Sequence, residues 1–225
     1  MRNKKIDRIF FIMIAMVAMV ISPGCNSVYT SKKTGYFHID LPKHTYQSYN
    51  ETGFPYSFEY PVYAVPVKDS TYFDSTPEND YWVNIDFPQF DARIFLSYKI
   101  IGGKSVFKIK NAKGTYYDSV GINEFDRMVN DAFNLTNKNE AVATSIKDSL
   151  FTNPNGITGV FFKVGGNAAT ATQFFLSDTS RHFLRGALYF SATPNSDSIK
   201  PVQDFLQQDI KHMINTFKWR GKGGE

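Results

Sequence analysis

Residues 82–100, WVNIDFPQFDARIFLSYKI, contain two strand-like runs on either side of Pro88–Gln89. In the second run, apolar side chains recur at every other position: Ala92, Ile94, Leu96, Tyr98 and Ile100. This period of two is typical of a strand with one buried face. Phe95 interrupts the polar side, so we expect the second face to be partly covered. The stretch therefore predicts a β-hairpin.

Further strand and helix signals lie on both sides of this hairpin. Strand-like runs at 56–60 and 62–67 precede it, and a polar loop at 68–80 separates them from it. After it, apolar residues at helical spacing predict a helix near 121–135. Four strand-like runs follow, near 141–151, 157–164, 170–178 and 182–192. The turn-forming stretches Asn153–Gly156 and Gly165–Asn167 lie between them.

The clearest element is a helix close to the C-terminus. Its stripe at i, i+3 and i+4 spacing consists of Val202, Phe205, Leu206, Asp209, Ile210, Met213, Ile214 and Phe217. Asp209 is the one polar member of the stripe. Pro201 fits the first turn of such a helix, where its missing N–H costs nothing.

The order of elements is strands, a helix, four strands and a helix. Short connections favour antiparallel pairing, with helices packed on the sheet. We therefore expect a single α+β domain with a mainly antiparallel sheet flanked by helices. The order is similar to that of the Mog1/PsbP-type sandwich, a fold analogy that carries no function.

The N-terminus has the pattern of a lipoprotein export signal. Residues 1–8, MRNKKIDR, are basic, and an apolar run of 13 residues from Ile9 to Ile21 follows. A helix of that length spans about 20 Å, less than the roughly 30 Å hydrocarbon core of a bilayer. Gly24 then precedes Cys25, the single cysteine of the chain. Small residues before a cysteine at this point resemble a lipobox, in which diacylglycerol is attached to the sulfur and cleavage makes the cysteine the new N-terminus.

These signals predict four segments. Residues 1–24 form the signal peptide, and residues 25–35 comprise the lipidated Cys25 and a polar tether. Residues 36–220 form the globular domain, and residues 221–225 a frayed tail. An ordinary signal peptide with an incidental cysteine is the alternative.

Composition narrows the class of function. The chain of 225 residues has a formal net charge of +4, of which residues 1–24 supply +3. A nearly neutral mature domain gives no electrostatic case for nucleic-acid binding. A single cysteine forms no internal disulfide.

The sequence contains no complete catalytic motif in the structural context that the motif requires. Gly102–Gly103–Lys104–Ser105 lacks the earlier glycine of a phosphate-binding loop, and it is interpreted as a Gly-Gly hairpin turn. No two histidines lie at i, i+4 spacing, so no metal site or cofactor is predicted. His38 and His44 are interpreted as loop or surface residues rather than paired metal ligands, and His212 as a solvated residue.

Three polar features remain as candidates. Asp86 and Asp91 bracket the Pro88–Gln89 turn, where they either cap the turn or face each other and share a proton. Arg185 lies mid-strand between Phe183 and Tyr189, close to His182, and makes either an internal stack or ion pair or a contact with a partner or ligand. Asn167, in Gly166–Ala169, precedes the neighbouring strand where small residues permit close approach of another chain, although a plain turn also explains them.

Several blocks of the chain together resemble the GldD family of gliding-motility lipoproteins from Bacteroidota. The blocks, in order, are GYFHIDLP (35–42), PYSFEYP (55–61), WVNIDFP (82–88), LSYK (96–99), GNAA (166–169), QF (173–174), HFLRGALYF (182–190) and FKW (217–219). The resemblance covers nearly the whole mature chain. It implies an envelope lipoprotein needed for gliding and linked to type IX secretion, with no established catalytic activity or cofactor.

Two hypotheses follow. The first is a non-enzymatic accessory of the gliding and secretion machinery, bound to a membrane through its lipid and to other machinery proteins, with no small-molecule substrate. No acidic residue directly follows Cys25, so the sequence has no signal for export to the cell surface. We therefore expect a protein that faces the periplasm, on the outer membrane. The second is an envelope hydrolase or ligand-binding lipoprotein that uses Asp86, Asp91, His182 and Arg185. The two are distinguished by whether these four groups converge in one pocket.

Overall fold

A computed structural model describes residues 39–68, 77–191 and 196–221. The predicted leader, Cys25, the tether and His38 lie outside the described residues, as do residues 222–225 of the predicted frayed tail. The boundaries proposed for these segments therefore stay predictions.

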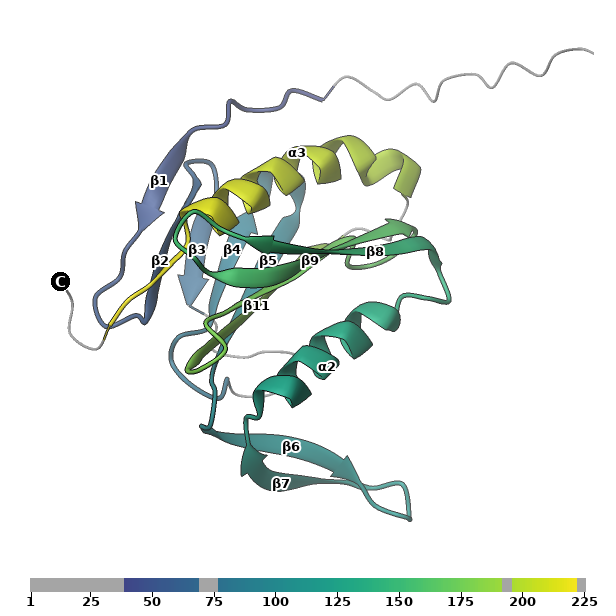
Figure 1. The fold of residues 1–225 in the computed structure, drawn as a ribbon. Helices are drawn as coiled ribbons and strands as arrows, with labels where there is room; N and C mark the ends of the chain where they lie inside the picture. The colour runs from purple at the N-terminus through teal and green to yellow at the C-terminus, as the bar shows by residue number, and fades with distance from the viewer. Residues whose placement is uncertain (1–38, 69–76, 192–195, 222–225) are drawn as a thin grey trace, which may run out of the picture. The chain divides into compact units, whose positions relative to one another are not determined.

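The described residues form one α+β domain, and its main sheet consists of antiparallel strands (Figure 1). Their order is β3 (Val65–Lys68), β4 (Val83–Phe87), β5 (Ala92–Ile100), β11 (His182–Phe190), β10 (Thr172–Ser177), β9 (Thr158–Gly166) and β8 (Ala143–Thr152). The predicted hairpin is β4 and β5, with Phe87 opposite Ala92. Its turn is the short 3₁₀ helix η1 (Pro88–Phe90), closed by Asp91 with a φ of 47°.

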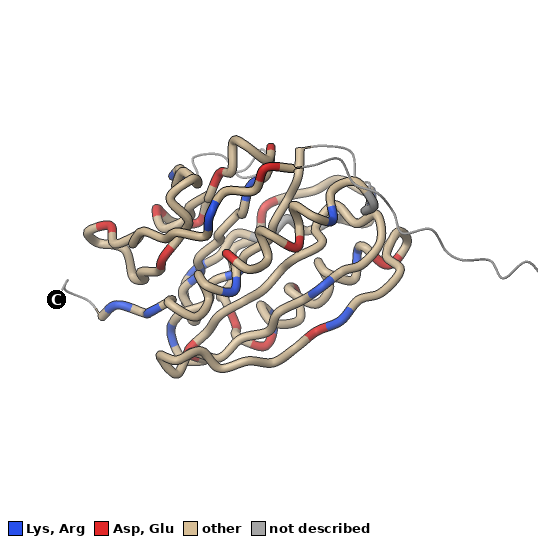
Figure 2. Tube along the Cα trace, turned by 90° about the horizontal axis from the view of Figure 1, so that it is seen from above, with Lys and Arg blue, Asp and Glu red and all other residues tan. Residues whose placement is uncertain are grey.

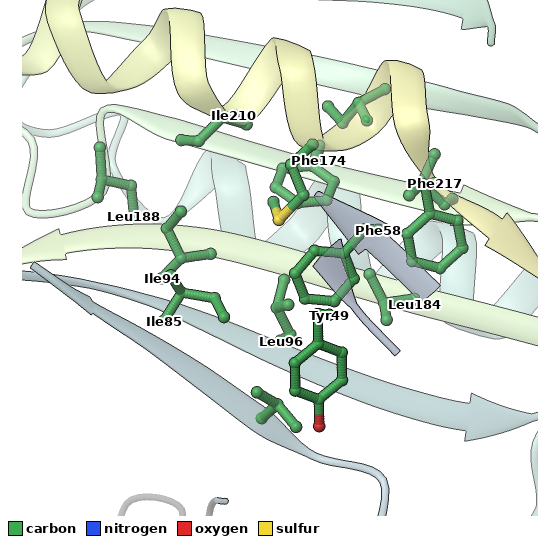
Figure 3. Packing of buried hydrophobic residues seen from close by; sticks show 14 of the residues in the cluster. Tyr49, Phe58, Ile85, Ile94, Leu96, Phe174, Leu184, Leu188, Ile210 and Phe217 are labelled. Atoms are coloured by element: carbon green, nitrogen blue, oxygen red, sulfur yellow. The ribbon is translucent and has the colours of Figure 1, made fainter. Parts of the chain in front are cut away.

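One face of the main sheet packs against the C-terminal helix α3 (Ser196–Thr216). A small sheet of β1 (Tyr46–Tyr49), β2 (Tyr56–Pro61) and β12 (Lys218–Trp219) closes the side of this layer. The aromatic content of the sequence is concentrated here, and Figure 3 shows Phe58, Phe174 and Phe217 packed together with aliphatic residues from the main sheet. Aromatic side chains contribute large buried areas, so this layer forms the principal core.

The other face of the main sheet is covered in part by α2 (Phe125–Asn137) (Figure 1). Met128 and Ala132 of the helix pack on Phe162, Phe175 and Phe183 of the strands. The strands thus alternate between two helical layers, which explains why the second face of β5 is only half-polar in sequence. Phe95 lies on this face, where its ring and that of Tyr189 make a T-shaped contact.

Two sequence predictions about element boundaries and one about burial are wrong. The first helix begins at Phe125, because residues 116–122 belong to a strand, and Ile122 is 58% exposed there. The last helix begins at Ser196, so Pro201 lies inside it rather than in its first turn. Ile100 is 42% exposed, because the buried face of β5 ends at Tyr98.

A hairpin of β6 (Lys104–Lys110) and β7 (Tyr116–Ile122) is separate from the main sheet. The sequence predicts a hairpin turn at Gly102–Gly103, and Gly102 does adopt a φ of 77°. However, the two strands that flank this turn do not pair with each other. The strand before it, β5, pairs with β11, and the strand after it, β6, pairs with β7, so the chain leaves the main sheet here. In Figure 1 the hairpin lies beyond α2, on the side of the main sheet away from α3.

Charged residues of both signs are interspersed along the described chain (Figure 2). This distribution fits the nearly neutral mature sequence.

Candidate functional site

Arg185 lies at a groove between α2 and the main sheet. Alternation along β11 directs Phe183 and Arg185 toward α2, whereas Leu184 faces the principal core. The groove has a volume of about 200 Å³. Its walls include Trp82, Ser97, Met128, Ala132, Leu135, Phe183 and Arg185. A cationic group thus stands in a mostly apolar recess.

A chain of neutral side chains holds the Arg185 guanidinium. Its Nη2 donates a hydrogen bond to Oε1 of Gln173. The Gln173 amide donates in turn to Thr170 Oγ1 at 2.9 Å, and Asn139 Nδ2 donates to the same oxygen at 3.2 Å. Gln173 is 1% exposed, so the orientation of its amide is fixed by these bonds. The guanidinium is therefore oriented by a neutral partner.

Arg185 has no carboxylate partner within 4.0 Å among the residues that the structure describes, and no aromatic ring there stacks on it. Lys99, also at the groove, is paired with Glu78 at 2.6 Å. Asp131 stands exposed at the mouth of the groove. Within residues 39–68, 77–191 and 196–221, the geometry thus gives no support to the internal ion pair or ring stack that the sequence offered as one alternative for Arg185.

His182 points to the opposite layer and is 8% exposed. Its Nδ1 lies 2.7 Å from the Tyr98 hydroxyl, and its ring stacks on Trp219 at 4.8 Å between centroids. Burial lowers the pKa of His182, while nearby Asp178 opposes that shift. These contacts make His182 part of the packing between the two sheets, in a different layer from Arg185.

Asn167 is exposed in the connection from β9 to β10, directly after Gly166, whose φ is 89°. It is not among the residues that line the Arg185 groove. The three residues named from the sequence are thus placed at three separate locations, and a partner contact at Asn167 stays a prediction.

The two aspartates of the hairpin do not form an acid–base pair. Asp86 accepts two hydrogen bonds from Arg93, at 2.5 and 2.6 Å. Asp91 adopts the left-handed conformation that closes the turn. Together with the placement of His182 and Arg185, this means that the four groups of the hydrolase hypothesis do not converge. Among the described residues, no three His, Cys, Asp or Glu side chains gather as metal ligands would.

Two other histidines are packed against neighbours. His44 Nδ1 lies 2.6 Å from Asp209 Oδ1, and the His212 ring stacks on Tyr46 with its Nε2 2.7 Å from Glu59. The prediction of a solvated His212 is therefore wrong. Polar residues on that side of α3 meet the β1 and β2 strands of the small sheet, which sequence periodicity alone does not reveal.

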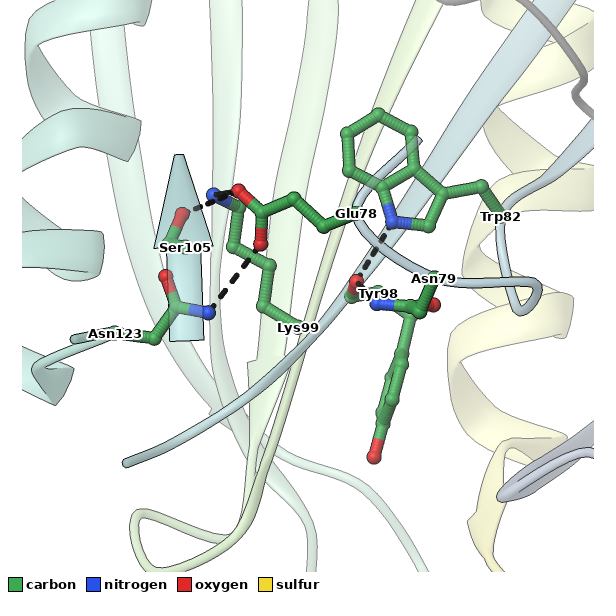
Figure 4. Close-up of polar contacts among 7 residues, drawn as sticks. All are labelled: Glu78, Asn79, Trp82, Tyr98, Lys99, Ser105 and Asn123. Carbon is green, nitrogen blue, oxygen red and sulfur yellow. Dashed lines mark hydrogen bonds and ion pairs between the residues drawn. The ribbon is translucent and has the colours of Figure 1, made fainter. Parts of the chain in front are cut away.

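A polar cluster ties the β6–β7 hairpin to the domain (Figure 4). The Glu78 carboxylate accepts hydrogen bonds from Ser105 Oγ and Lys99 Nζ, and from Asn123 Nδ2 at 3.3 Å. Ser105 is 1% exposed and Asn123 is 3% exposed. Beside it, Trp82 Nε1 donates to the Tyr98 carbonyl at 2.8 Å. Buried donors at the base of the hairpin thus converge on one acidic residue.

The hairpin carries apolar side chains exposed to solvent on both faces. Val106 and Val120 are directly opposite each other and are 56% and 73% exposed. Ile109 and Tyr117 form an opposed and exposed pair on the other face. Sequence reasoning missed this surface, although alternation of apolar and lysine residues in KSVFKIK (104–110) is a strand signal. Exposed apolar clusters of this kind are typical of sites that contact other molecules.

These features define an α+β domain with an exposed apolar hairpin and an arginine groove. The family model for the gliding motility lipoprotein GldD matches residues 26–219, beginning one residue after Cys25. The chain therefore belongs to the GldD family of gliding motility lipoproteins, which are envelope-anchored proteins. No curated protein matches the chain significantly.

Among solved structures, the chain is similar to cyanobacterial PsbP from Synechocystis sp. PCC 6803. The two share 13% sequence identity with a TM-score of 0.40, over 82% of this chain and 98% of the cyanobacterial one. Separately, within the described residues, the helices are all too short or too polar to cross a bilayer.

Proposed function

We propose that the protein is a membrane-anchored, periplasm-facing and non-enzymatic accessory of the gliding motility and type IX secretion machinery. The observation that carries this proposal is the family match over residues 26–219, directly after the cysteine predicted to bear lipid. Dispersal of Asp86, Asp91, His182 and Arg185 supports the non-enzymatic role. The periplasm-facing orientation rests on the lack of acidic residues directly after Cys25, which leaves the sequence without a surface-export signal. Placement on the outer membrane is part of the same proposal.

The β6–β7 hairpin is the surface we assign to a machinery partner. A two-stranded hairpin buries little apolar area by itself, and both faces of this one expose apolar residues. Residues 104–122 are also basic, with Lys104, Lys108, Lys110 and Lys113 against Asp118. The occupant that matches this surface is a partner protein strand that alternates apolar and acidic residues and extends the hairpin by one strand.

A deletion strain complemented with variants tests both parts of the proposal. Val106→Thr with Val120→Thr keeps two exposed β-branched residues while removing apolar surface, so the fold should be retained. We expect reduced colony spreading and reduced export of cell-surface proteins at normal protein levels. Leu150→Thr is the matched control, since Leu150 is 85% exposed in β8, outside the hairpin. Wild-type spreading and export by the double variant would remove the hairpin from the proposal.

The anchor is tested independently. Mass spectrometry of the native protein should show an N-terminal Cys25 bearing acyl chains, and Cys25→Ser should release the protein from membranes. Two or three acyl chains anchor stably, because each buried methylene contributes about 0.8 kcal/mol. Density fractionation of the wild type should place it with the outer membrane, and recovery with the inner membrane would contradict that placement.

Ligand binding is a second candidate function, favoured by the groove at Arg185. Its cation, held by Gln173 and lacking a carboxylate partner among the described residues, differs from Arg93, which Asp86 neutralises. The groove offers no nucleophile and base in mutual contact among its wall residues, so we retain binding and not hydrolysis as this alternative.

A further inference from the structure

We propose that the groove at Arg185 binds a small organic carboxylate with a compact apolar body. The carboxylate would bind the Arg185 guanidinium, and the apolar body would lie between Phe183, Trp82 and the Met128–Ala132 side of α2. This inference goes beyond the accessory role proposed above and does not depend on it.

The first argument is the state of the guanidinium. A guanidinium has five N–H donors, and Arg185 uses one of them in a side-chain hydrogen bond within the described chain. The acceptor is a neutral amide, so the positive charge is uncompensated there. A carboxylate binds a guanidinium through two parallel hydrogen bonds, so it is a ligand that satisfies such a fork.

The second argument is preorganisation. Gln173, Thr170 and Asn139 are all buried, and their hydrogen bonds form a chain that ends on the guanidinium. A buried polar chain of this kind fixes the cation before any ligand arrives, and preorganisation lowers the entropic cost of binding. Gln173 is therefore a positioning residue for Arg185.

The third argument is the size and lining of the groove. Phe183 is 3% exposed, Met128 6% and Trp82 7%, so the apolar walls are well packed. The volume of about 200 Å³ exceeds that of an engineered cavity of roughly 150 Å³ that holds benzene. A ring or branched chain of about six carbons therefore fits in this volume.

Two other charged groups at the groove set the expected affinity. Lys99 is engaged by Glu78, so its charge is already compensated. Asp131 is exposed at the mouth and repels an incoming carboxylate. Removal of the Asp131 charge should therefore strengthen binding, whereas loss of the Arg185 charge should weaken it.

The test is equilibrium dialysis of labelled benzoate against the intact lipoprotein in nanodiscs of zwitterionic phosphatidylcholine, with empty nanodiscs as the blank. Benzyl alcohol is the neutral probe of the same shape. We expect saturable benzoate binding and at least tenfold weaker binding of benzyl alcohol, since one charge-assisted bidentate contact supports a difference of that order.

Four variants complete the test. Arg185→Gln should weaken benzoate binding about tenfold or more. Gln173→Glu should also weaken it, because the new carboxylate would neutralise Arg185 from within while leaving the groove open. Asp131→Asn should tighten it, and Arg93→Gln should leave it unchanged. Circular dichroism and thermal unfolding confirm that each variant is folded.

Equal binding of benzoate and benzyl alcohol would overturn the inference, as would benzoate binding that survives both Arg185→Gln and Gln173→Glu. Absence of saturable benzoate binding to the folded wild type would overturn it too. None of these outcomes bears on spreading or export by hairpin variants, so failure here is distinguishable from failure of the proposed accessory role.

Discussion

His44 Nδ1 lies 2.6 Å from Oδ1 of Asp209, and this contact joins the segment before β1 to the buried face of α3. The same carboxylate accepts hydrogen bonds from the hydroxyls of Tyr46 and Tyr63. Burial and the adjacent Asp209 raise the pKa of Tyr46 to about 12, so this hydroxyl stays a donor at neutral pH. Asp209 is 1% exposed and is satisfied by three donors from the N-terminal part of the domain.

Asp209→Asn should lower the free energy of unfolding by about 1–3 kcal/mol, since the new amide group places a donor against donors in a buried site. Urea unfolding followed by circular dichroism measures the loss. Asp204→Asn on the same helix is the control, because Asp204 is 43% exposed and should change stability little. Equal stability of both variants would contradict the role given to Asp209.

Gly186 of β11 should not tolerate a larger side chain. A Cβ built on it would lie 2.2 Å from Cζ of the Phe174 ring, which is itself buried in the principal core. Overpacking of this kind costs about 1–3 kcal/mol, so Gly186→Ala should lower the thermal midpoint by several degrees. Gly221→Ala meets nothing within 4 Å and should leave the midpoint unchanged.

The lowered pKa of His182 predicts a loss of stability in mild acid. Burial depresses its folded-state pKa below the ordinary value of 6.5, so the unfolded chain binds the proton more readily. The contribution of His182 is therefore fully present above pH 6.5 and is lost as the pH falls from there toward the folded-state pKa.

Urea unfolding of the wild type and of His182→Gln between pH 7.5 and pH 5 isolates this effect, because every other ionisable group is the same in both proteins. The difference in unfolding free energy between them should shrink as the pH falls. A difference that is constant or grows toward pH 5 would show that the His182 pKa is not depressed.

Glu78 should control the order of the β6–β7 hairpin. Glu78→Gln removes the counter-ion of Lys99 and turns an N–H₂ group toward the donors of Ser105 and Asn123 (Figure 4). We expect backbone amides of the hairpin to exchange with deuterium faster by about tenfold, with little change in the main sheet. Asp80→Asn serves as the control, since Asp80 is 88% exposed. Unchanged hairpin exchange in Glu78→Gln would contradict the anchoring role.

Periodicity in the sequence predicted the elements that bury one regular face. The β4–β5 hairpin and the stripe of α3 are of this kind, and Asp209 was correctly placed on that stripe. The same logic failed at Ile122, which has helical spacing with the apolar residues of α2 but lies in an exposed strand. Periodicity assumes that apolar residues are buried, and the β6–β7 hairpin violates that assumption.

The groove could be predicted only in part. The sequence around Arg185 indicated a cationic side chain in the middle of a strand between aromatic residues. Its hydrogen-bond partner Gln173 could not be predicted, because the contact depends on the pairing of β10 with β11. Separation of His182 from Arg185 follows from their odd spacing along a strand, since residues three apart point to opposite faces. That rule was available from the sequence, and it argues against a shared site.

The contacts of His44 and Tyr46 with Asp209 also have a mechanical consequence. A pull on the N-terminal end of the domain reaches His44 before it reaches the β1–β2 ladder, which begins at Tyr46. The side chains of both residues contact the Asp209 carboxylate of α3. Tension from a tethered end would thus be shared between a helix and a strand pair. The domain would resist peeling at its first strand, and load would be delivered to the aromatic interior as a whole.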